Sequence, residues 1–209
     1  MSTKTTTNAP RQLILASTSR YRRELLERLA LPFFVAAPGV DEAALPGEPP
    51  AQTALRLAEA KARAVAARYP DALVIGSDQI ADCSGEAIGK PGSRPRAVDQ
   101  LRLLSGKTVT FHTAIALVDA ASGRCSTALV DVASTLRTLS TEEIDAYLDR
   151  EEPYDCAGSV RSEGLGVALF DRIQSDDPTA LIGLPLIALA RMLRDEGVDV
   201  LVPAKSLAA

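Results

Sequence analysis

The stretch from residue 12 to residue 31 constrains the fold more than any other part of the chain. Residues 12–16 (QLILA) are a short apolar run, which predicts a buried strand. A polar turn, Ser-Thr-Ser, comes next, and residues 20–31 then repeat leucine at helical spacing, with Ser19 well suited to cap a helix. We therefore expect a strand, a turn and a helix at the start of the domain.

The rest of the chain continues with short strands and helices in mixed order. We expect strands over residues 33–36, 72–76, 108–118, 125–136 and 165–173, and helices over residues 51–69, 94–104, 141–150 and 184–196. Because this order is not a strict β-α-β repeat, it predicts an α/β fold with a mixed sheet. No repeat or linker divides the chain, so we expect a single domain over residues 11–202. Tails are expected at residues 1–10 and 203–209.

Composition excludes several classes of protein. The chain has 23 Lys and Arg against 27 Asp and Glu, a net charge of -4, which disfavours a nucleic-acid or acidic-membrane surface. Apolar residues make up 46% of the chain, yet no run reaches the ~18 residues that a membrane span needs. Three distant cysteines and one histidine predict reduced thiols and no zinc site. The polar start lacks the apolar region of a signal peptide, so we expect a cytoplasmic protein.

Ser17, Ser19 and Arg22 lie where the first predicted strand passes into the first helix. Backbone N–H groups and the helix dipole favour an anion at such a helix start. Either Arg20 or Arg22 can bind a phosphate through two parallel hydrogen bonds. A capped helix with exposed basic residues explains the same pattern, and the Walker phosphate loop is absent.

Acidic residues follow two other apolar segments. Asp41 and Glu42 come after a Pro-Gly turn and suit Mg²⁺, although a solvated acidic loop is the simpler explanation. Asp78 follows the apolar run 72–76, where a carboxylate is costly unless it is paired or binds a cation. Asp78 is therefore the best single catalytic candidate, as metal ligand or as acceptor of a proton from water, with a turn cap as the alternative.

Two lysines complete the candidate set. Lys90 lies between Gly89 and Pro91 in a stiff turn that suits a phosphate oxygen, although most turn lysines are simply solvated. Lys61 lies on the Ala-rich predicted helix, where a solvated lysine is again the simpler explanation. Jointly, the candidates supply acids for a metal and cations for phosphates, without a thiol or histidine nucleophile. That combination suits hydrolysis of a phosphoanhydride by metal-activated water.

Seven segments, in this order, resemble the Maf family of nucleotide pyrophosphatases. They are LILASTSRYRRELL (13–26), VDE (40–42), LAEAKA (57–62), VIGSDQ (74–79), IGKP (88–91), AGSVRSEGLG (157–166) and LIGLPLIAL (181–189). The resemblance runs from about residue 13 to residue 200. It implies a mixed, twisted sheet with flanking helices and two lobes around a central cleft. It also implies hydrolysis between the α- and β-phosphates with a divalent cation, Mg²⁺ or Mn²⁺.

The resemblance also implies roles for single residues. The family's proton acceptor falls on Asp78, which together with Glu42 is expected to bind the metal. Its phosphate-binding positions fall on Ser17, Ser19, Arg22, Lys61 and Lys90. One departure appears, because family members often have Glu just before the helix lysine, where this chain has Ala60. Glu59 is adjacent but points about 100° away around the helix.

Three positions distinguish branches of the family by substrate. The branch that acts on dTTP and UTP has Arg, Thr and Gln where this chain has Tyr21, Gln79 and Glu163, so the chain resembles the branch that hydrolyses 7-methyl-GTP. The methylated base is a cation, so an aromatic ring gains about 0.5–2 kcal/mol by stacking on it. Glu163 can accept from the N1-H and N2-H edge, and Gln79 can complete the polar contacts. That branch usually has Trp in place of Tyr21, and a tyrosine simply packed on a lobe surface is the alternative.

The sequence is also compatible with two other functions. The first is the same chemistry on dTTP, UTP or modified pyrimidines. The second is a division-related binding protein without essential catalysis, as the family's association with septum formation implies. We expect a nucleoside triphosphate as the partner, without nucleic acid or membrane, and a homodimer is compatible with the sequence.

Overall fold

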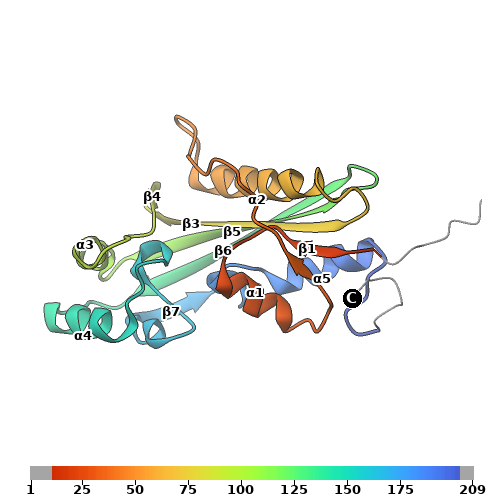
Figure 1. The fold of residues 1–209 in the computed structure, drawn as a ribbon. Coiled ribbons are helices and arrows are strands. Elements are labelled where there is room, and N and C mark those ends of the chain that lie inside the picture. Colours follow the sequence, from red (N-terminus) through yellow and green to blue (C-terminus); the bar gives the residue numbers. More distant parts are fainter. Residues whose placement is uncertain (1–10, 203–209) are drawn as a thin grey trace, which may run out of the picture.

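The computed structural model describes residues 11–202, so both expected tails lie outside the described residues (Figure 1). Within this range the α-helices are α1 (Arg20–Glu27), α2 (Pro50–Ala66), α3 (Arg94–Leu104), α4 (Thr141–Glu151) and α5 (Leu186–Asp195). The strands are β1 (Leu13–Leu15), β2 (Phe34–Val35), β3 (Leu73–Cys83), β4 (Glu86–Ile88), β5 (Thr108–Asp119), β6 (Cys125–Leu136) and β7 (Phe170–Gln174). None of these helices combines the length and apolar character that a bilayer span requires.

The expected elements occur in the expected order, with one strand, β4, that the sequence did not predict and with corrections at two other strands. Strand β3 continues to Cys83 instead of ending at residue 76, because residues 76–82 keep pairing with residues 110–116 of the long strand β5. The strand expected over 165–173 was wrong for its first half: residues 165–169 form a 3₁₀ helix, and β7 begins at Phe170. A Cβ on Gly166 would lie 2.4 Å from the Arg161 carbonyl oxygen, so the chain turns tightly here.

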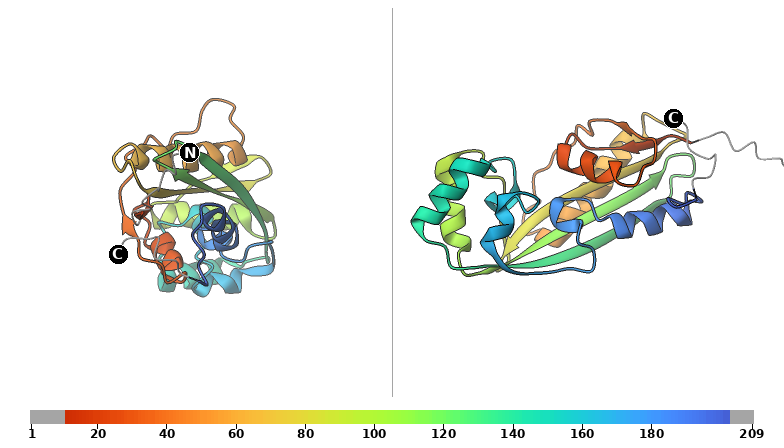
Figure 2. Two further views of the ribbon diagram at one scale, coloured as in Figure 1. Left: turned by 90° about the vertical axis from the view of Figure 1, so that its right-hand side faces the viewer. Right: turned by 90° about the horizontal axis from the view of Figure 1, so that it is seen from below.

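The strands form one mixed sheet in the order β2-β1-β3-β5-β6-β7, with β4 paired to β3. Strand β1 runs parallel to β2 and β3, and the remaining pairs are antiparallel. The long strands β3, β5 and β6 extend through the whole molecule, and helices cover both faces of the sheet (Figures 1 and 2). This is the mixed α/β architecture that the sequence predicts.

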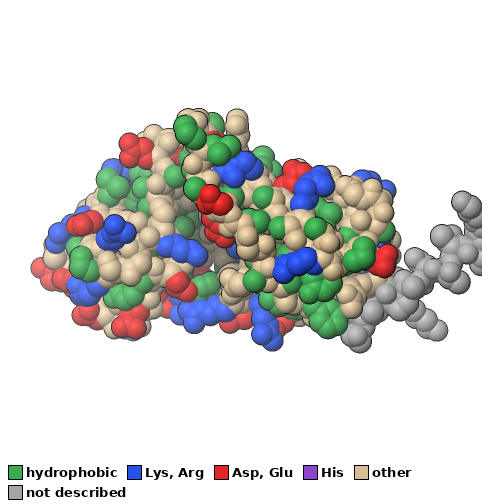
Figure 3. Space-filling view, turned by 45° about the horizontal axis from the view of Figure 1, so that its top comes forward, with side chains coloured by type: hydrophobic (Ala, Val, Ile, Leu, Met, Phe, Trp, Pro, Cys, Tyr) green, Lys and Arg blue, Asp and Glu red, His purple; other side chains and the backbone are tan. Residues whose placement is uncertain are grey.

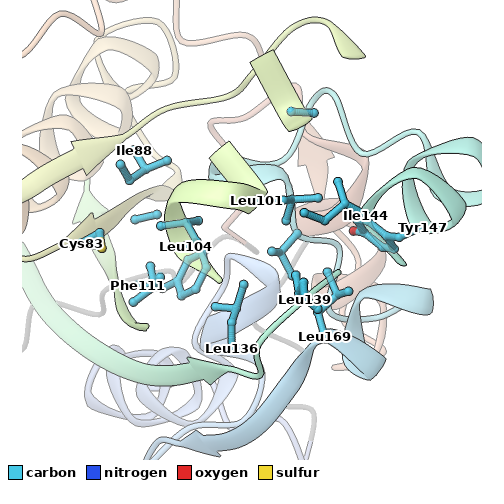
Figure 4. Packing of buried hydrophobic residues seen from close by; sticks show 14 of the residues in the cluster. Cys83, Ile88, Leu101, Leu104, Phe111, Leu136, Leu139, Ile144, Tyr147 and Leu169 are labelled. Carbon is cyan, nitrogen blue, oxygen red and sulfur yellow. The ribbon is translucent and has the colours of Figure 1, made fainter. Parts of the chain in front are cut away.

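Three clusters of buried side chains give the molecule its two lobes. In one lobe, α2 packs on one face of the sheet, and α1 and α5 pack on the other. In the other lobe, α3, α4 and the far ends of the long strands surround a single cluster that includes Leu101, Phe111 and Tyr147 (Figure 4). The long strands are shared by both lobes, which fixes the lobes relative to each other.

One edge of β3 is open between the lobes. Strand β1 pairs with residues 73–75 of β3, and β4 pairs with residues 81–83 along the same edge. Residues 76–80 of β3 therefore have a neighbouring strand only on the β5 side. Backbone and side chains of this short stretch are left to line a cleft, which is where the sequence places Asp78 and Gln79.

Candidate active site

A cavity of about 560 Å³ opens at this edge, and a smaller one of about 100 Å³ shares part of its lining. Figure 3 shows the hollow between the two lobes. The larger cavity is lined by nine of the ten residues expected at the site: Ser17, Ser19, Tyr21, Arg22, Glu42, Lys61, Asp78, Gln79 and Lys90. The tenth, Glu163, lines the smaller cavity. Segments that are far apart in the sequence thus meet at one cleft.

Lys61 joins the two candidate carboxylates. Its Nζ lies 2.6 Å from Asp78 Oδ1 and 3.0 Å from Glu42 Oε1. The lysine is only 4% exposed, so the solvated-lysine explanation was wrong. Asp78 lies inside β3 rather than after it, and its carboxylate accepts from Lys61 instead of capping a turn. Removing this partner would leave a buried carboxylate uncompensated, so the pair is held together by electrostatics as well as by packing.

A glycine brings the Lys61 helix close enough for this contact. A Cβ on Gly76 would lie 2.1 Å from the Ala58 carbonyl oxygen and 2.7 Å from the Ala62 nitrogen, both in α2. Only glycine allows that approach of helix to strand. Asp78, two residues further along β3, points to the same face of the sheet and meets Lys61. Glu59 instead pairs with Arg63 on the exposed side of α2 at 2.7 Å, as its angular position predicts.

The turn before α1 is organised as a capped helix start. Ser19 Oγ accepts from the Arg22 backbone N–H at 3.4 Å, and Ser17 Oγ accepts from the Ser19 N–H at 3.1 Å. Each hydroxyl hydrogen stays available to donate to a ligand. The cap and the anion-binding explanations are therefore compatible, since the same turn lines the larger cavity.

Arg22 and Lys90 bring uncompensated positive charge to the cleft. Arg22 Nε donates to the Gly183 carbonyl at 2.9 Å, which turns the guanidinium into the cavity. Burial lowers the pKa of this guanidinium, while the charges of Asp78 and Glu42 oppose that effect. Across residues 11–202, neither Arg22 nor Lys90 forms a salt bridge. Both cations are free to bind an anion.

Tyr21, Gln79 and Glu163 lie on the side of the cleft toward the smaller cavity. Gln79 Nε2 donates to Thr113 Oγ1 and to the carbonyls of Ala180 and Leu181 at 2.9–3.0 Å. The amide oxygen is therefore left to accept from a ligand. Burial raises the pKa of the Tyr21 hydroxyl to about 12, so the ring stays neutral. Tyr21 lines both cavities, so its ring is within reach of a ligand in either one.

Sequence reasoning missed the residue that holds the 180–183 turn. Asp177, 2% exposed, accepts from Thr179 Oγ1 at 2.7 Å and from the Ile187 N–H at 2.7 Å. These bonds fix the turn whose carbonyls hold Gln79 and Arg22. The Asp-Pro-Thr sequence signals a local turn, but the contact ten residues away has no sequence signal.

Comparisons with known proteins identify the family of the chain. The family model described as Maf-like protein matches residues 12–196. A 7-methyl-GTP pyrophosphatase of Albidiferax ferrireducens is 58% identical over 191 residues, covering 91% of this chain and 96% of the relative. Proteins with the same name from Cupriavidus pinatubonensis and Bordetella pertussis are 58% and 59% identical, covering 92% and 91% of this chain and 96% and 94% of their own lengths. The chain belongs to the family of Maf-like proteins.

Proposed function

We propose that this chain is a nucleoside triphosphate pyrophosphatase that hydrolyses 7-methyl-GTP to 7-methyl-GMP and diphosphate. One arrangement carries the proposal: the unpaired cations Arg22 and Lys90 share a cavity with the Lys61–Asp78–Glu42 cluster, and a pocket for a base adjoins it. The relatives that bear this activity in their names are 56–59% identical over most of the chain. A cavity of about 560 Å³ falls in the usual range for small-molecule sites, roughly 300–1,000 Å³.

The triphosphate binds along the cationic wall of the cleft. The Ser17 and Ser19 hydroxyls and the first N–H groups of α1 donate to phosphate oxygens, and Arg22 adds its two terminal nitrogens. Lys90 contributes a point charge from the opposite lobe. Binding the phosphates thus draws on both lobes, which fixes the substrate between them.

The carboxylates fit a divalent cation. Within residues 11–202 no cluster of three or more Asp, Glu, His or Cys side chains is arranged to enclose a metal. Mg²⁺ often needs only one or two carboxylates because water and substrate phosphates complete its shell. Asp78 Oδ2 and Glu42 Oε2 accept no hydrogen bond from the described residues, so Glu42 Oε2 is available as a ligand and Asp78 Oδ2 is available either as a second ligand or to accept a proton from metal-bound water. When bound there, the cation would neutralise phosphate charge and acidify a water molecule.

Side chains of the protein then accept the proton of the attacking water and stabilise the charge on the leaving group. Water adds to the α-phosphorus, the bond from that phosphorus to the bridging oxygen breaks, and diphosphate leaves. Asp78 Oδ2 takes the proton of the attacking water, while Lys61 holds Oδ1 in place at 2.6 Å. Lys61, Arg22 and Lys90 offset the negative charge that develops on the leaving group.

The base pocket favours a cationic purine. Tyr21 offers its ring to a methylated guanine, Glu163 offsets the positive charge and accepts from the N1-H and N2-H edge, and Gln79 offers its amide oxygen. Because Gln79 and Tyr21 line both cavities, they connect base selection to the phosphate site.

Product analysis tests the proposal. The wild-type chain with Mg²⁺ or Mn²⁺ should convert 7-methyl-GTP to 7-methyl-GMP and diphosphate in equal amounts, and a chelator should stop the reaction. Release of single phosphates would refute cleavage between the α- and β-phosphates. Full activity in the presence of chelator would refute the role given to the metal. Binding of 7-methyl-GTP without turnover would favour a binding protein.

A further inference from the structure

Arg161 touches both side chains assigned to the base but lines neither cavity. Its Cζ lies 5.7 Å from the centre of the Tyr21 ring, and its Nε lies 3.5 Å from Glu163 Oε1. Tyr21 and Glu163 line the smaller cavity, and Arg161 does not. These two side chains therefore separate the guanidinium from a bound base. Any effect of Arg161 on the substrate must pass through them.

Glu151 anchors Arg161 and the loop that carries Glu163. Glu151, the last residue of α4, accepts from Arg161 Nη1 at 2.7 Å and from the Leu165 N–H at 2.6 Å. Its side chain is only 10% exposed. A Cβ on Gly164 would lie 2.6 Å from this carboxylate, so the backbone wraps closely around it. The position of the loop over residues 161–165 is thus set from α4 by one buried carboxylate.

Arg161 Nε is a buried donor without an acceptor. In residues 11–202, Ser134 Oγ is the only other buried side-chain polar atom in that condition. An unmet donor of this kind costs about 1–3 kcal/mol, more when the group is charged. Glu163 Oε1 is the nearby acceptor, at 3.5 Å but not aligned for a hydrogen bond. A small rotation of Glu163 would satisfy this donor, and Glu163 Oε2, which accepts from Ser162 Oγ at 3.4 Å, keeps a second lone pair for the base.

We propose that Arg161 is a positioning residue for base selection. Its guanidinium, held by Glu151, orients Glu163 for the N1-H and N2-H edge and lies 5.7 Å from the centre of the Tyr21 ring. A cationic 7-methylguanine gains more from an oriented carboxylate than neutral guanine does, so Arg161 contributes to the preference for the methylated nucleotide. This inference rests on the proposed function.

The test compares kcat/KM for 7-methyl-GTP and for GTP in matched variants. In Arg161→Gln, the ratio of the two values should fall about tenfold, because Glu163 loses the charged group that orients it. The fall should come from a higher KM for 7-methyl-GTP rather than from kcat, because the base lies away from the reacting phosphorus. Arg150→Gln removes an exposed arginine of α4 that forms no side-chain hydrogen bond or salt bridge within residues 11–202, and should keep the wild-type ratio.

A double mutant separates positioning from simple structural support. If Arg161 acts through Glu163, then Arg161→Gln combined with Glu163→Gln should lower the ratio no further than Glu163→Gln alone. Losses that multiply in the double mutant would overturn the inference. So would equal kcat losses for both nucleotides together with a lower melting temperature.

A conservative variant keeps the test decisive if Arg161→Gln does not fold. Arg161→Lys retains a cation for Glu151 but has no second donor beside Glu163, so we expect the ratio to fall about threefold, less than for Gln. A wild-type ratio in Arg161→Lys would then overturn the inference. The kcat/KM ratio of the wild type is measured first. If the wild type does not prefer 7-methyl-GTP over GTP, the proposed function is refuted, and this inference is refuted with it. A selective wild type with equally selective variants refutes only the role of Arg161.

Discussion

The phosphate side and the base side of the cleft are built differently. On the phosphate side, Lys61 and Asp78 come from α2 and β3, and the close packing at Gly76 fixes their distance. On the base side, Glu163 lies in a loop that depends on side-chain contacts with Glu151 and Arg161. Regular elements hold the Lys61–Asp78 pair, to which we assign the proton transfer, and a loop holds Glu163, to which we assign base selection. Selectivity can therefore change without disturbing the chemistry.

Removing the proton acceptor should have the largest effect. Asp78→Asn keeps the shape of the side chain but cannot take a proton from water, so kcat with 7-methyl-GTP should fall by about 10²–10⁴-fold. Asp82→Asn alters the next carboxylate on the same face of β3, which lines neither cavity, and should retain wild-type turnover. Wild-type turnover in Asp78→Asn would remove this residue from the mechanism.

Disturbing the close packing at Gly76 should lower both the stability of the protein and its turnover, because Lys61 and Asp78 both depend on that packing. Gly76→Ala puts a Cβ against the backbone of α2, which must shift and carry Lys61 away from Asp78. We expect a loss of about 1–3 kcal/mol in the free energy of unfolding, together with reduced turnover of every nucleotide. Thermal or urea unfolding measures the first effect, with Gly89→Ala as control because open space surrounds a Cβ there. Unchanged stability would show that α2 adapts freely.

Altering the base side should change the ranking of substrates rather than the chemistry. Glu163→Gln keeps the size and removes the charge, so the kcat/KM ratio of 7-methyl-GTP to GTP should fall about tenfold. Glu24→Gln, on the exposed side of α1, serves as the charge-matched control. If the ratio does not change, Glu163 has no part in selectivity and the contrast between the two sides of the cleft is lost.

The smallest effect is expected at the aromatic position. Tyr21→Trp should raise the same ratio about two- to fivefold, because Trp has the strongest cation–π interaction, about 0.5–1 kcal/mol at partly exposed sites. Steady-state kinetics with both nucleotides measures it. A lower ratio would mean that the ring does not stack on the base and that the Tyr21 hydroxyl, which contacts Arg20 and Asp155, matters more.

The contrast between the two sides also explains what the sequence could predict. The strand, turn and helix around Ser19, and the apolar run before Asp78, are local patterns, and the sequence predicts both. The burial of Lys61 is not local, because it depends on how closely α2 approaches Gly76. A solvated Lys61 side chain was therefore the better prediction from the local sequence pattern, and that prediction was wrong.

Residues 165–173 illustrate a second limit. Their apolar content predicts one strand, but the tight approach of Gly166 to the Arg161 carbonyl makes the first half a 3₁₀ helix. The contact of Glu151 with Arg161 and the contact of Asp177 with Ile187 had no sequence signal, since the partners are ten residues apart in each case. Long-range contacts of this kind require the structure.

The assignment of this chain as a 7-methyl-GTP pyrophosphatase is best tested by measuring diphosphate release from a panel of nucleotides. Wild-type kcat/KM would be measured with Mg²⁺ for 7-methyl-GTP, GTP, dTTP, UTP and CTP. We predict that 7-methyl-GTP has the highest kcat/KM and that activity on every nucleotide disappears in Asp78→Asn. A ranking led by dTTP or UTP would leave the phosphate chemistry intact and contradict the assignment of Tyr21, Gln79 and Glu163 to a methylated purine.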